Sequence, residues 1–505
     1  MKTIIHQWSC TVCMAGILGM ASCTNGFEEM NRNPNAGEET NEIYYLTKVI
    51  IQTACDYQHE AYMGIPGVAG RYITGLRNAD DELLNWGPAG WDSHYLRLSV
   101  NKTLHDLAEK NGREQYMALS SILEVFNFAL VTELWGDIPY SEALRSKSDR
   151  IIYPKYDRQE EIYPDLIRKL KEANAVLQNT SSSIDAAADV LYGGNREQWR
   201  KFANSLRLRL LLRASEKWPD AYSEMQEMVN SPVQYPLFSG NDDDAEIPYT
   251  VTHKFPGGPT GGGGMLTDEY AEFIKRRPGK EIIDFFVERQ DPRLPVLFDP
   301  VAQPSGYTVD PNEYVGVPIS LLSPYDYNGG GDHISTLRTA WFYQDTHPQI
   351  RASLITYAEV CFILAEAVQK DRVSVNGETA ESLYRKGITA SLNYWGIDSP
   401  EVISAYLSQA GVAYDGTLKQ LLRQKWAALF LKGCEGWFDS RRTGDATGLH
   451  DDLRSTENGG NAAQAFLPSR YIYPDGERAQ NREQYEKAIA LFGDDHINTK
   501  MWLVK

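Results

Sequence analysis

Two stretches of the sequence place aromatic side chains beside amide and carboxylate groups. The first is a glycine-punctuated stretch that ends in Asn85-Trp86. The second is Tyr325-Asp326-Tyr327-Asn328, which three glycines follow, and it leads on to Trp341. An aromatic face packs on the C–H groups of a sugar ring, while amides and carboxylates bind its hydroxyl groups. The residues predicted to contact such a ligand are Asn85, Trp86, Tyr325, Asp326, Tyr327 and Trp341.

The competing interpretation of each aromatic residue is that it packs inside the protein, since buried aromatics dominate protein cores. The sequence has 11 Trp and 29 Tyr in 505 residues, more than a minimal core needs, so we expect some at the surface. Glycine-rich excursions between helices are where binding loops usually lie. Of two neighbouring tryptophans, Trp91 begins a helical stripe and is expected in the core, whereas Trp86 is expected to be freer.

The other motifs that could carry chemistry are incomplete. The glycine-rich stretch 257–264 is not a phosphate loop, because no Gly-Lys-Ser or Gly-Lys-Thr follows it. Residues 241–246 carry enough oxygens for calcium but lack the Gly and final Glu of an EF-hand loop, so a solvated acidic loop is the simpler interpretation. We predict no catalytic residue, no metal and no cofactor. A carboxylate pair for glycoside hydrolysis stays an open alternative among 68 acidic residues.

Charge and cysteine usage narrow the class of protein further. The formal net charge of -18 argues against nucleic acid as a partner, because an acidic chain repels polyphosphate. Beyond Cys23, the remaining cysteines Cys55, Cys361 and Cys434 are far apart and lie in apolar sequence. We expect buried free thiols there and no disulfide framework.

The first 22 residues have the features of a secretory signal. Lys2 precedes a mostly apolar run that ends in Met20-Ala21-Ser22-Cys23, and small residues directly before a cysteine are similar to the lipobox of bacterial lipoproteins. We predict cleavage before Cys23 and attachment to a membrane through a lipid on its thiol. The alternative is an ordinary cleaved signal with a chance cysteine. Residues 23–40 are polar and Asn-rich, and are predicted to form a flexible tether.

Helical periodicity dominates both flanks of the remaining chain. The predicted helices are 43–55, 91–102, 113–134, 162–177, 195–210, 354–368, 380–392 and 418–430. Between residues 231 and 341 proline and glycine interrupt the pattern, which predicts long loops with short helices at 266–274 and 281–287. Small residues at contact positions of the helix pairs, such as Ala358, Ala365 and Gly387, resemble tetratricopeptide stacking.

The predicted fold is therefore mainly α. We expect one domain over 41–505, in which a tetratricopeptide-like scaffold of helical hairpins at about 41–230 and 350–505 carries a loop-rich insertion at about 231–350 that displays the ligand site. Asn195 is expected to cap the helix after it, with Gln198 as its reciprocal partner. The basic cluster of Arg207, Arg209 and Arg213 is expected to form a solvated or carboxylate-paired face.

Several blocks, in the same order along the chain, resemble the SusD/RagB family of surface nutrient-binding lipoproteins. The opening Asn31-Arg32-Asn33-Pro34-Asn35 is similar to the Asn-x-Asn-Pro start of its SusD-like branch, and Glu28-Glu29 is similar to the acidic export signal of surface lipoproteins in Bacteroidetes. The further blocks are LWGDIPY (134–140), YGGN (192–195), FANSLRLR (202–209), ITYAEV (355–360), AEA (365–367), QKWAALF (424–430), EGWFDSRRTG (435–444) and LPSRYIYP (467–474).

The resemblance implies a non-catalytic, tetratricopeptide-like protein on the outside of the outer membrane. Such a protein caps a SusC-like TonB-dependent transporter and hands it oligosaccharides or, in some relatives, peptides. A peptide ligand is thus one alternative, and a surface glycoside hydrolase is another. The matched blocks are mostly scaffold, so Asp439, Arg441 and Arg442 are expected in buried ion pairs. The family's ligand-binding positions vary between members, so the site residues above depend on their chemistry alone.

Overall fold

The computed structural model describes residues 41–76, 83–249, 273–302, 313–319, 321, 323–343, 347–451 and 467–504. The predicted signal segment, Cys23, the tether, the stretch 257–264 and most of the predicted helix 266–274 lie outside the described residues.

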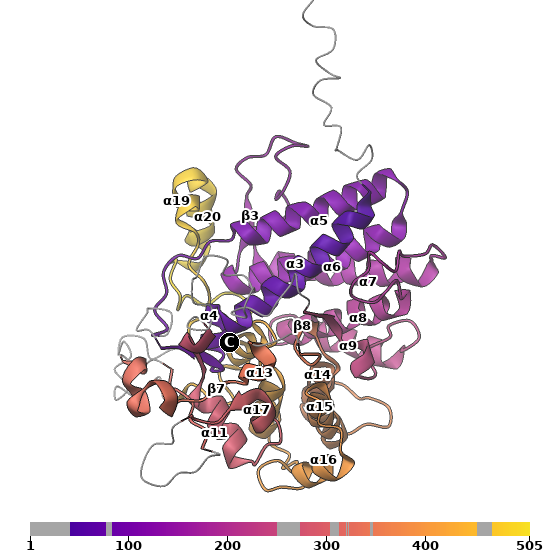
Figure 1. Cartoon of the computed structure of the whole chain (residues 1–505). Helices are drawn as coiled ribbons and strands as arrows, with labels where there is room; N and C mark the ends of the chain where they lie inside the picture. Colours follow the sequence, from indigo (N-terminus) through magenta and orange to yellow (C-terminus); the bar gives the residue numbers. More distant parts are fainter. Residues whose placement is uncertain are drawn as a thin grey trace, which may run out of the picture.

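The first half of the scaffold consists mainly of long helices. They are α3 (Glu42–Tyr62), α4 (Ile65–Ala69), α5 (Asp92–Lys110), α6 (Glu114–Trp135), α7 (Gln159–Asn179), α8 (Arg196–Ala214) and α9 (Ala221–Asn230). Sequence neighbours pack on each other from α5 to α9, and α3 packs on α5 and α6, so these helices form a layered array (Figure 1). This arrangement confirms the predicted helical-hairpin scaffold.

The helix α6 is the centre of this array. Its apolar residues cover nearly the whole circumference, as predicted, and almost every residue from Ala118 to Trp135 is buried. By length and composition α6 could cross a membrane, but 83% of its most apolar window is buried by neighbouring parts of the protein, which makes it a core helix. It ends at Gly136, whose φ of 90° suits glycine and whose N–H donates to the Thr132 carbonyl at 2.7 Å.

The described residues in the middle of the chain form short elements, as the sequence predicts for its loop-rich stretch. They are η1 (Asn241–Asp243), β4 (Ala245–Pro248), β5 (Arg276–Pro278), α11 (Lys280–Glu288), α12 (Leu294–Leu297), β6 (Phe298–Asp299), η2 (Pro324–Gly329), η3 (Gly331–His333), β7 (Thr336–Leu337), α13 (Thr339–Phe342) and β8 (Arg351–Ile355). The strands form two-stranded antiparallel ladders, β1 (Ile73–Gly75) with β5, β2 (Ile138–Pro139) with β3 (Tyr156–Asp157), β4 with β8, and β6 with β7. These short ladders connect the loops to one another and to the scaffold.

The second half of the scaffold begins after β8. Its helices are α14 (Tyr357–Gln369), α15 (Ala380–Tyr394), α16 (Pro400–Leu407), α17 (Leu418–Ala428), α18 (Glu435–Thr443), α19 (Asp475–Gln480) and α20 (Arg482–Phe492). The predicted start of the first of these at Leu354 is wrong, because Leu354 lies in the buried strand β8. A short apolar run does not distinguish a buried strand from a helix. The side chain of Thr356 accepts a hydrogen bond from the Glu359 N–H and so starts α14 three residues later.

Two local predictions have mixed outcomes. Asn195 caps α8 as predicted, but the Gln198 side chain donates to the Asp242 carbonyl at 2.8 Å and not back to Asn195, because the η1 turn packs beside α8. The three described cysteines are free; Cys361 and Cys434 are buried as predicted, whereas Cys55 is only half-buried.

The close contact between α14 and α15 depends on Gly387. A Cβ placed on Gly387 would lie 2.7 Å from Cε2 of Phe362, whereas a Cβ on Gly476 in α19 would meet nothing within 4 Å. Gly387→Ala should therefore destabilise the protein by about 1–3 kcal/mol through overpacking, despite the better helix propensity of Ala. The matched control Gly476→Ala should be neutral or stabilising by up to about 1 kcal/mol. Urea unfolding measures both, and a Gly387→Ala protein as stable as wild type would contradict the predicted contact.

Candidate functional site

The turn formed by η2 and η3 presents the second predicted cluster to solvent. Tyr325 is 65% exposed, and Asp326 beside it is also exposed. Among the described residues, Tyr325 is one of three strongly exposed tyrosines, with Tyr44 and Tyr153. Of the predicted ligand contacts, Tyr325 thus has the exposure that stacking on a sugar requires.

The η2–η3 turn is held by its own backbone geometry. The Gly330 N–H donates to the Tyr327 carbonyl at 2.8 Å, and the Asn328 side chain donates to the His333 carbonyl at 2.8 Å. Gly330 has φ 75°, and a Cβ on it would lie 2.6 Å from the carbonyl oxygen of Tyr325. Glycine is therefore required where the chain folds back beneath Tyr325.

A small hydrophobic cluster anchors the turn to the rest of the protein. Tyr327 packs on the buried side chains of Leu76, Val317 and Ile334. The guanidinium of Arg277 in β5 donates to the Ile334 carbonyl at 3.1 Å. Leu76 directly follows β1 and belongs to the glycine-punctuated stretch that ends in Asn85-Trp86. The structure therefore brings part of that stretch into contact with the stretch that carries Tyr325.

Trp341 lies on α13 and already has ring partners. Its indole stacks on the imidazole of His347, with ring centroids 4.0 Å apart and planes at 12°, and the Arg338 guanidinium lies 5.3 Å from the indole centroid. Burial and the charge of Arg338 lower the pKa of His347, so the imidazole is neutral at pH 7. Trp341 is half-buried, and His347 covers part of its surface.

The expectation that Trp86 is freer than Trp91 is wrong. Trp86 is 3% exposed and Trp91 is 5% exposed. The Trp86 indole N–H donates to the Arg470 carbonyl at 3.3 Å, and its ring lies edge-on to Trp437 at 5.7 Å. An indole enclosed in this way has no free face for a sugar, so Trp86 belongs to the core. Asn85 beside it is half-buried, as are Tyr327 and Trp341, whereas Tyr325 and Asp326 are exposed. The candidate surface is built around Tyr325 from the residues of its own stretch, Asp326, Tyr327 and Trp341.

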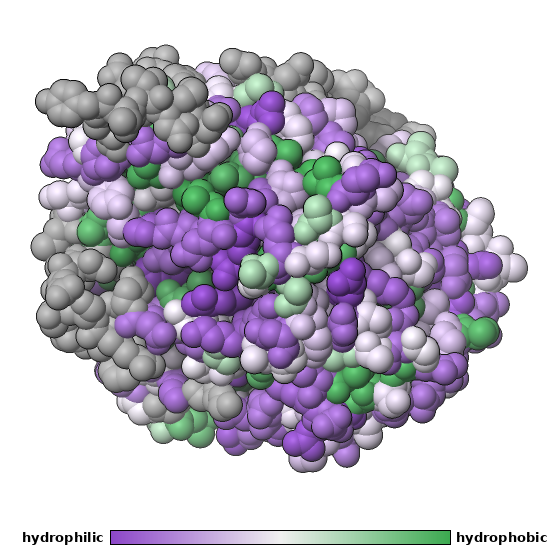
Figure 2. All heavy atoms as spheres, turned by 90° about the horizontal axis from the view of Figure 1, so that it is seen from below, coloured by the Kyte–Doolittle hydropathy of each residue, from purple (hydrophilic) through white to green (hydrophobic). Residues whose placement is uncertain are grey.

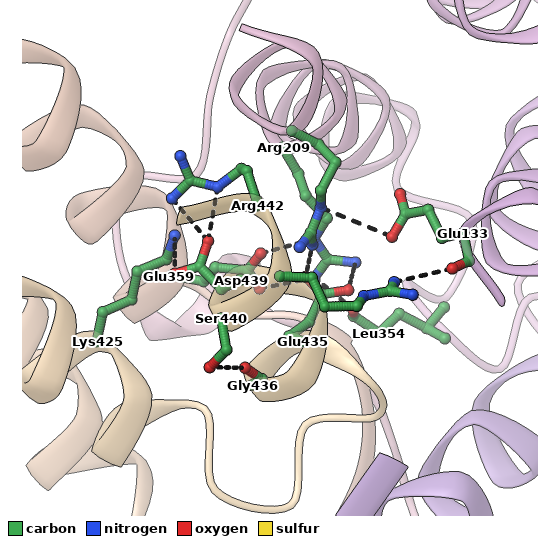
Figure 3. A network of polar contacts seen from close by, with 12 residues as sticks. Glu133, Arg209, Leu354, Glu359, Lys425, Glu435, Gly436, Asp439, Ser440 and Arg442 are labelled. Atoms are coloured by element: carbon green, nitrogen blue, oxygen red, sulfur yellow. Dashed lines mark hydrogen bonds and ion pairs between the residues drawn. The ribbon is translucent and has the colours of Figure 1, made fainter. Parts of the chain in front are cut away.

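The arginines of the sequence blocks lie in a buried ion-pair network (Figure 3). Arg209 of α8 binds both carboxylate oxygens of Glu359 at 2.6 Å, and Glu435 accepts from Arg213 and lies 3.5 Å from Arg209. Arg213 also lies 3.6 Å from Glu133 of α6. Arg207 pairs with Glu224. The interpretation of this cluster as carboxylate-paired is therefore confirmed, and the arginines hold the helices together.

The second part of the network involves the EGWFDSRRTG block. Arg442 binds Glu366 at 2.7 Å and Asp439 at 2.8 Å, and Lys425 lies 3.1 Å from Asp439, as predicted for buried ion pairs. The prediction is wrong for Arg441, which has no carboxylate partner among the described residues. Its guanidinium donates to the backbone carbonyl of Glu133 at 2.8 Å and to that of Ser469. The guanidinium carbon lies 4.1 Å from the Trp437 ring centroid.

The acidic stretch 241–246 is used by the fold. Lys201 binds both carboxylate oxygens of Asp243 at 2.8 Å, and one of these also accepts from the N–H and hydroxyl of Ser239. Asp244 accepts from the Tyr357 N–H at 2.5 Å. Donors from α8 and α14 thus bind both carboxylate oxygens of Asp243 and one of the two of Asp244.

One further group of possible metal ligands occurs within the described residues, His105, Asp106 and Glu109 on α5. Lys102 binds both carboxylate oxygens of Asp106 at 2.8 Å, so this group is explained by an ion pair on an exposed helix face.

Sequence reasoning missed the residues that flank Trp341. Arg338 stands three positions before Trp341, a spacing that brings two side chains together in a helical turn and could have been noticed. His347 has no such signal, because it reaches Trp341 from beyond the end of α13.

The fold is a helical scaffold whose loops present the candidate surface. The sequence matches, over residues 34–474, a SusD-like family described as starch-binding and associating with the outer membrane. Since the match covers most of the chain, this protein belongs to the SusD-like family of nutrient-binding outer membrane proteins. The family consists of non-catalytic binding proteins, which confirms the prediction that the chain is not an enzyme.

Solved structures agree with this assignment. A SusD homologue from Bacteroides fragilis NCTC 9343 is 25% identical with a TM-score of 0.74, and the alignment covers 92% of this chain and 100% of that one. An outer membrane protein from Bacteroides vulgatus ATCC 8482, described as involved in nutrient binding, is 22% identical with a TM-score of 0.76 over 92% and 100% of the two chains. A chitin-binding SusD homologue from Flavobacterium johnsoniae is 22% identical with a TM-score of 0.72 over 92% and 98%. A search of curated proteins gave no match.

The ion pairs of Glu366 predict a pH-dependent stability. Burial by itself would raise the pKa of Glu366, but the charges of Arg442 and Lys425 lower it to about 2 from an ordinary 4.5. The folded state therefore gains stability above pH 4.5 and loses it as the pH falls towards 2. Glu366→Gln should cost on the order of 3 kcal/mol at pH 7, and less than about half of that at pH 3.

Urea unfolding at the two pH values measures this effect. Glu483→Gln is the control, because it removes an exposed partner of Lys487 and should leave the stability nearly unchanged. An equal loss of stability in Glu366→Gln at both pH values would refute the assignment of this pH dependence to Glu366.

Proposed function

We propose that this protein binds oligosaccharide through Tyr325, Asp326, Tyr327 and Trp341 and delivers it to a SusC-like TonB-dependent transporter. The single observation that carries the proposal is the 65% exposure of Tyr325 on a turn fixed by glycines and a hydrophobic anchor. A rigid aromatic face stacks on a sugar with little loss of conformational entropy. Asp326 beside it supplies acceptors for hydroxyl groups.

The properties of the relatives support a carbohydrate ligand. The family is described as starch-binding, and a homologue of the same fold binds chitin, so two different glycans are associated with this scaffold. The association of the family with the outer membrane supports delivery to a transporter in that membrane. A lipid on Cys23 would hold the protein at that membrane, on the side that faces the cell exterior.

The ligand surface is tested by calorimetric titration with a panel of oligosaccharides. Tyr325→Ala should weaken binding of the preferred glycan about tenfold, because it removes an exposed stacking face. Trp341→Ala should weaken it by a similar factor. Tyr153→Ala is the matched control, since Tyr153 is 57% exposed but lies in the segment between β2 and β3, and it should leave the affinity unchanged. Wild-type affinity in both site variants would remove these residues from the site, and binding of peptides without any glycan would contradict the proposed ligand class.

The lipid anchor is tested by Cys23→Ala in cells. The variant should move from the membrane to the soluble fraction and keep its circular dichroism spectrum and melting temperature, because Cys23 precedes the folded scaffold. Cys55→Ala, which changes a half-buried thiol of α3, should stay in the membrane fraction. A Cys23→Ala protein that remained membrane-bound would show that another segment attaches it.

A further inference from the structure

A hollow of about 470 Å³ lies between α11 and α17, and Gly448, Leu449 and Asp451, which follow α18, complete its wall. Its lining holds both signs of charge. The cations are Lys280, Arg289 and Arg423, the carboxylates are Glu281, Asp284, Glu288 and Asp451, and Phe285 and Pro318 add apolar surface. Figure 2 shows the underside of the view in Figure 1, the side on which α11 and α16 lie; hydrophilic side chains gather across its middle, and hydrophobic ones form small separate patches. The hollow is therefore a polar site and not an apolar groove.

Arg423 is a cation in this cleft without a carboxylate partner. Its Nε donates to the Thr447 carbonyl at 2.8 Å, which fixes the guanidinium plane. Within the described part of the chain Arg423 makes no ion pair, and the carboxylates of Glu288, Asp445 and Asp451 act on it only from a longer distance. Burial and the nearby charge of Arg289 lower the pKa of Arg423, and the three carboxylates offset this only in part, so a further negative charge in direct contact with the guanidinium would be favourable.

Arg289 places a second guanidinium in the same cleft. Its guanidinium carbon lies 4.1 Å from the centroid of the Phe285 ring, and Nη1 donates to the Phe285 carbonyl at 3.2 Å. The side chain is 16% exposed, so it is held against the cleft wall. A planar guanidinium supported by an aromatic ring is suited to bidentate binding of a carboxylate or sulfate.

The carboxylates around the cleft already have cationic neighbours. Lys280 pairs with Asp284, Arg289 with Glu288 at 3.1 Å, and Arg71 with Glu281 at 3.2 Å. Asp451 and Lys419 both approach Gly448. Asp451 Oδ2 lies 2.9 Å and Lys419 Nζ lies 3.0 Å from the position that a Cβ on this glycine would take. A lysine is therefore near the Asp451 carboxylate too. None of these ion pairs includes Arg423, so its positive charge has no direct partner among the described residues.

The cleft adjoins the proposed ligand surface. The backbone N–H of Lys280 donates to the Val317 carbonyl at 2.9 Å, and Val317 belongs to the cluster on which Tyr327 packs. The next residue, Pro318, lines the cleft. Burial lowers the pKa of Lys280, but Asp284 and the nearby hydroxyl of Tyr327 raise it overall, which also indicates that Tyr327 is close to Lys280.

We infer that this cleft is an anion subsite, in which Arg423 and Arg289 bind a carboxylate or sulfate group of an acidic glycan whose neutral part lies at Tyr325 and Tyr327. The inference rests on the proposed function and names the substrate class. It predicts selectivity for uronate-containing or sulfated oligosaccharides over neutral ones, in a protein whose overall charge of -18 would otherwise repel them.

The test is calorimetric titration of the full protein with three oligosaccharides of equal length, one neutral, one containing uronate and one sulfated. At least one acidic oligosaccharide should bind about tenfold more tightly than the neutral one, with an advantage that shrinks as salt rises. Arg423→Gln should remove this preference and leave the affinity for the neutral oligosaccharide unchanged. Arg482→Gln, an equal change of charge at an exposed residue of α20, is the control and should keep the preference. The uronate and sulfate arms show which anion the cleft takes.

Asp451→Asn should change the affinity for acidic oligosaccharides in the opposite direction. Removal of its negative charge from the rim should strengthen binding of the acidic oligosaccharide by a few fold. Equal affinity for all three oligosaccharides, or an acidic preference that survives Arg423→Gln, would overturn the anion subsite and leave the proposed function intact. Failure of every oligosaccharide to bind would instead overturn the proposed function.

Discussion

The carboxylates Glu133, Glu359, Glu366 and Glu435 are withdrawn from water where α6, α8, α14, α17 and α18 meet, and the fold depends on their partners. A buried carboxylate is tolerated only when a cation and hydrogen-bond donors replace the water it loses. Arg209 and Arg213 from α8 provide this for three of them, and Arg442 and Lys425 provide it for Glu366. Because these residues come from distant parts of the sequence, the charges are satisfied only when the two halves of the scaffold are packed in this arrangement (Figure 3).

A second set of interactions joins the C-terminal segment to the same core. The Tyr471 N–H donates to the Leu134 carbonyl at 2.7 Å, and the indole N–H of Trp437 donates to the Pro468 carbonyl at 2.9 Å. Trp135 and Trp86 pack in the same aromatic cluster. Much of the aromatic content of the chain is therefore used in the core. The loops between the scaffold halves are left to supply exposed rings, and Tyr325 is the clearest instance.

The periodic parts of the fold could be predicted from the sequence, because the apolar stripe of α6 or α7 is itself the surface that packs. Predictions failed where a distant residue decides the outcome. Trp86 has the loop surroundings of a ligand contact, but it is buried by a partner 384 positions away, the carbonyl of Arg470. Arg441 looks like its neighbour Arg442 in sequence, yet it faces carbonyls and the Trp437 ring. The cleft formed by Arg289 and Arg423 has no local pattern at all, because α11 and α17 meet only in the folded protein.

Charge pairing and aromatic packing lie inside the helical body, and the loops carry the exposed ring proposed for recognition, on a turn whose geometry glycines fix. The central proposal is that a glycan binds at the turn carrying Tyr325. The most direct measurement is a crystal structure of the protein with the tightest-binding oligosaccharide. The account predicts a sugar ring against the face of Tyr325, with its hydroxyl groups near Asp326. Sugar density elsewhere on the protein, with the face of Tyr325 in contact only with solvent, would contradict it.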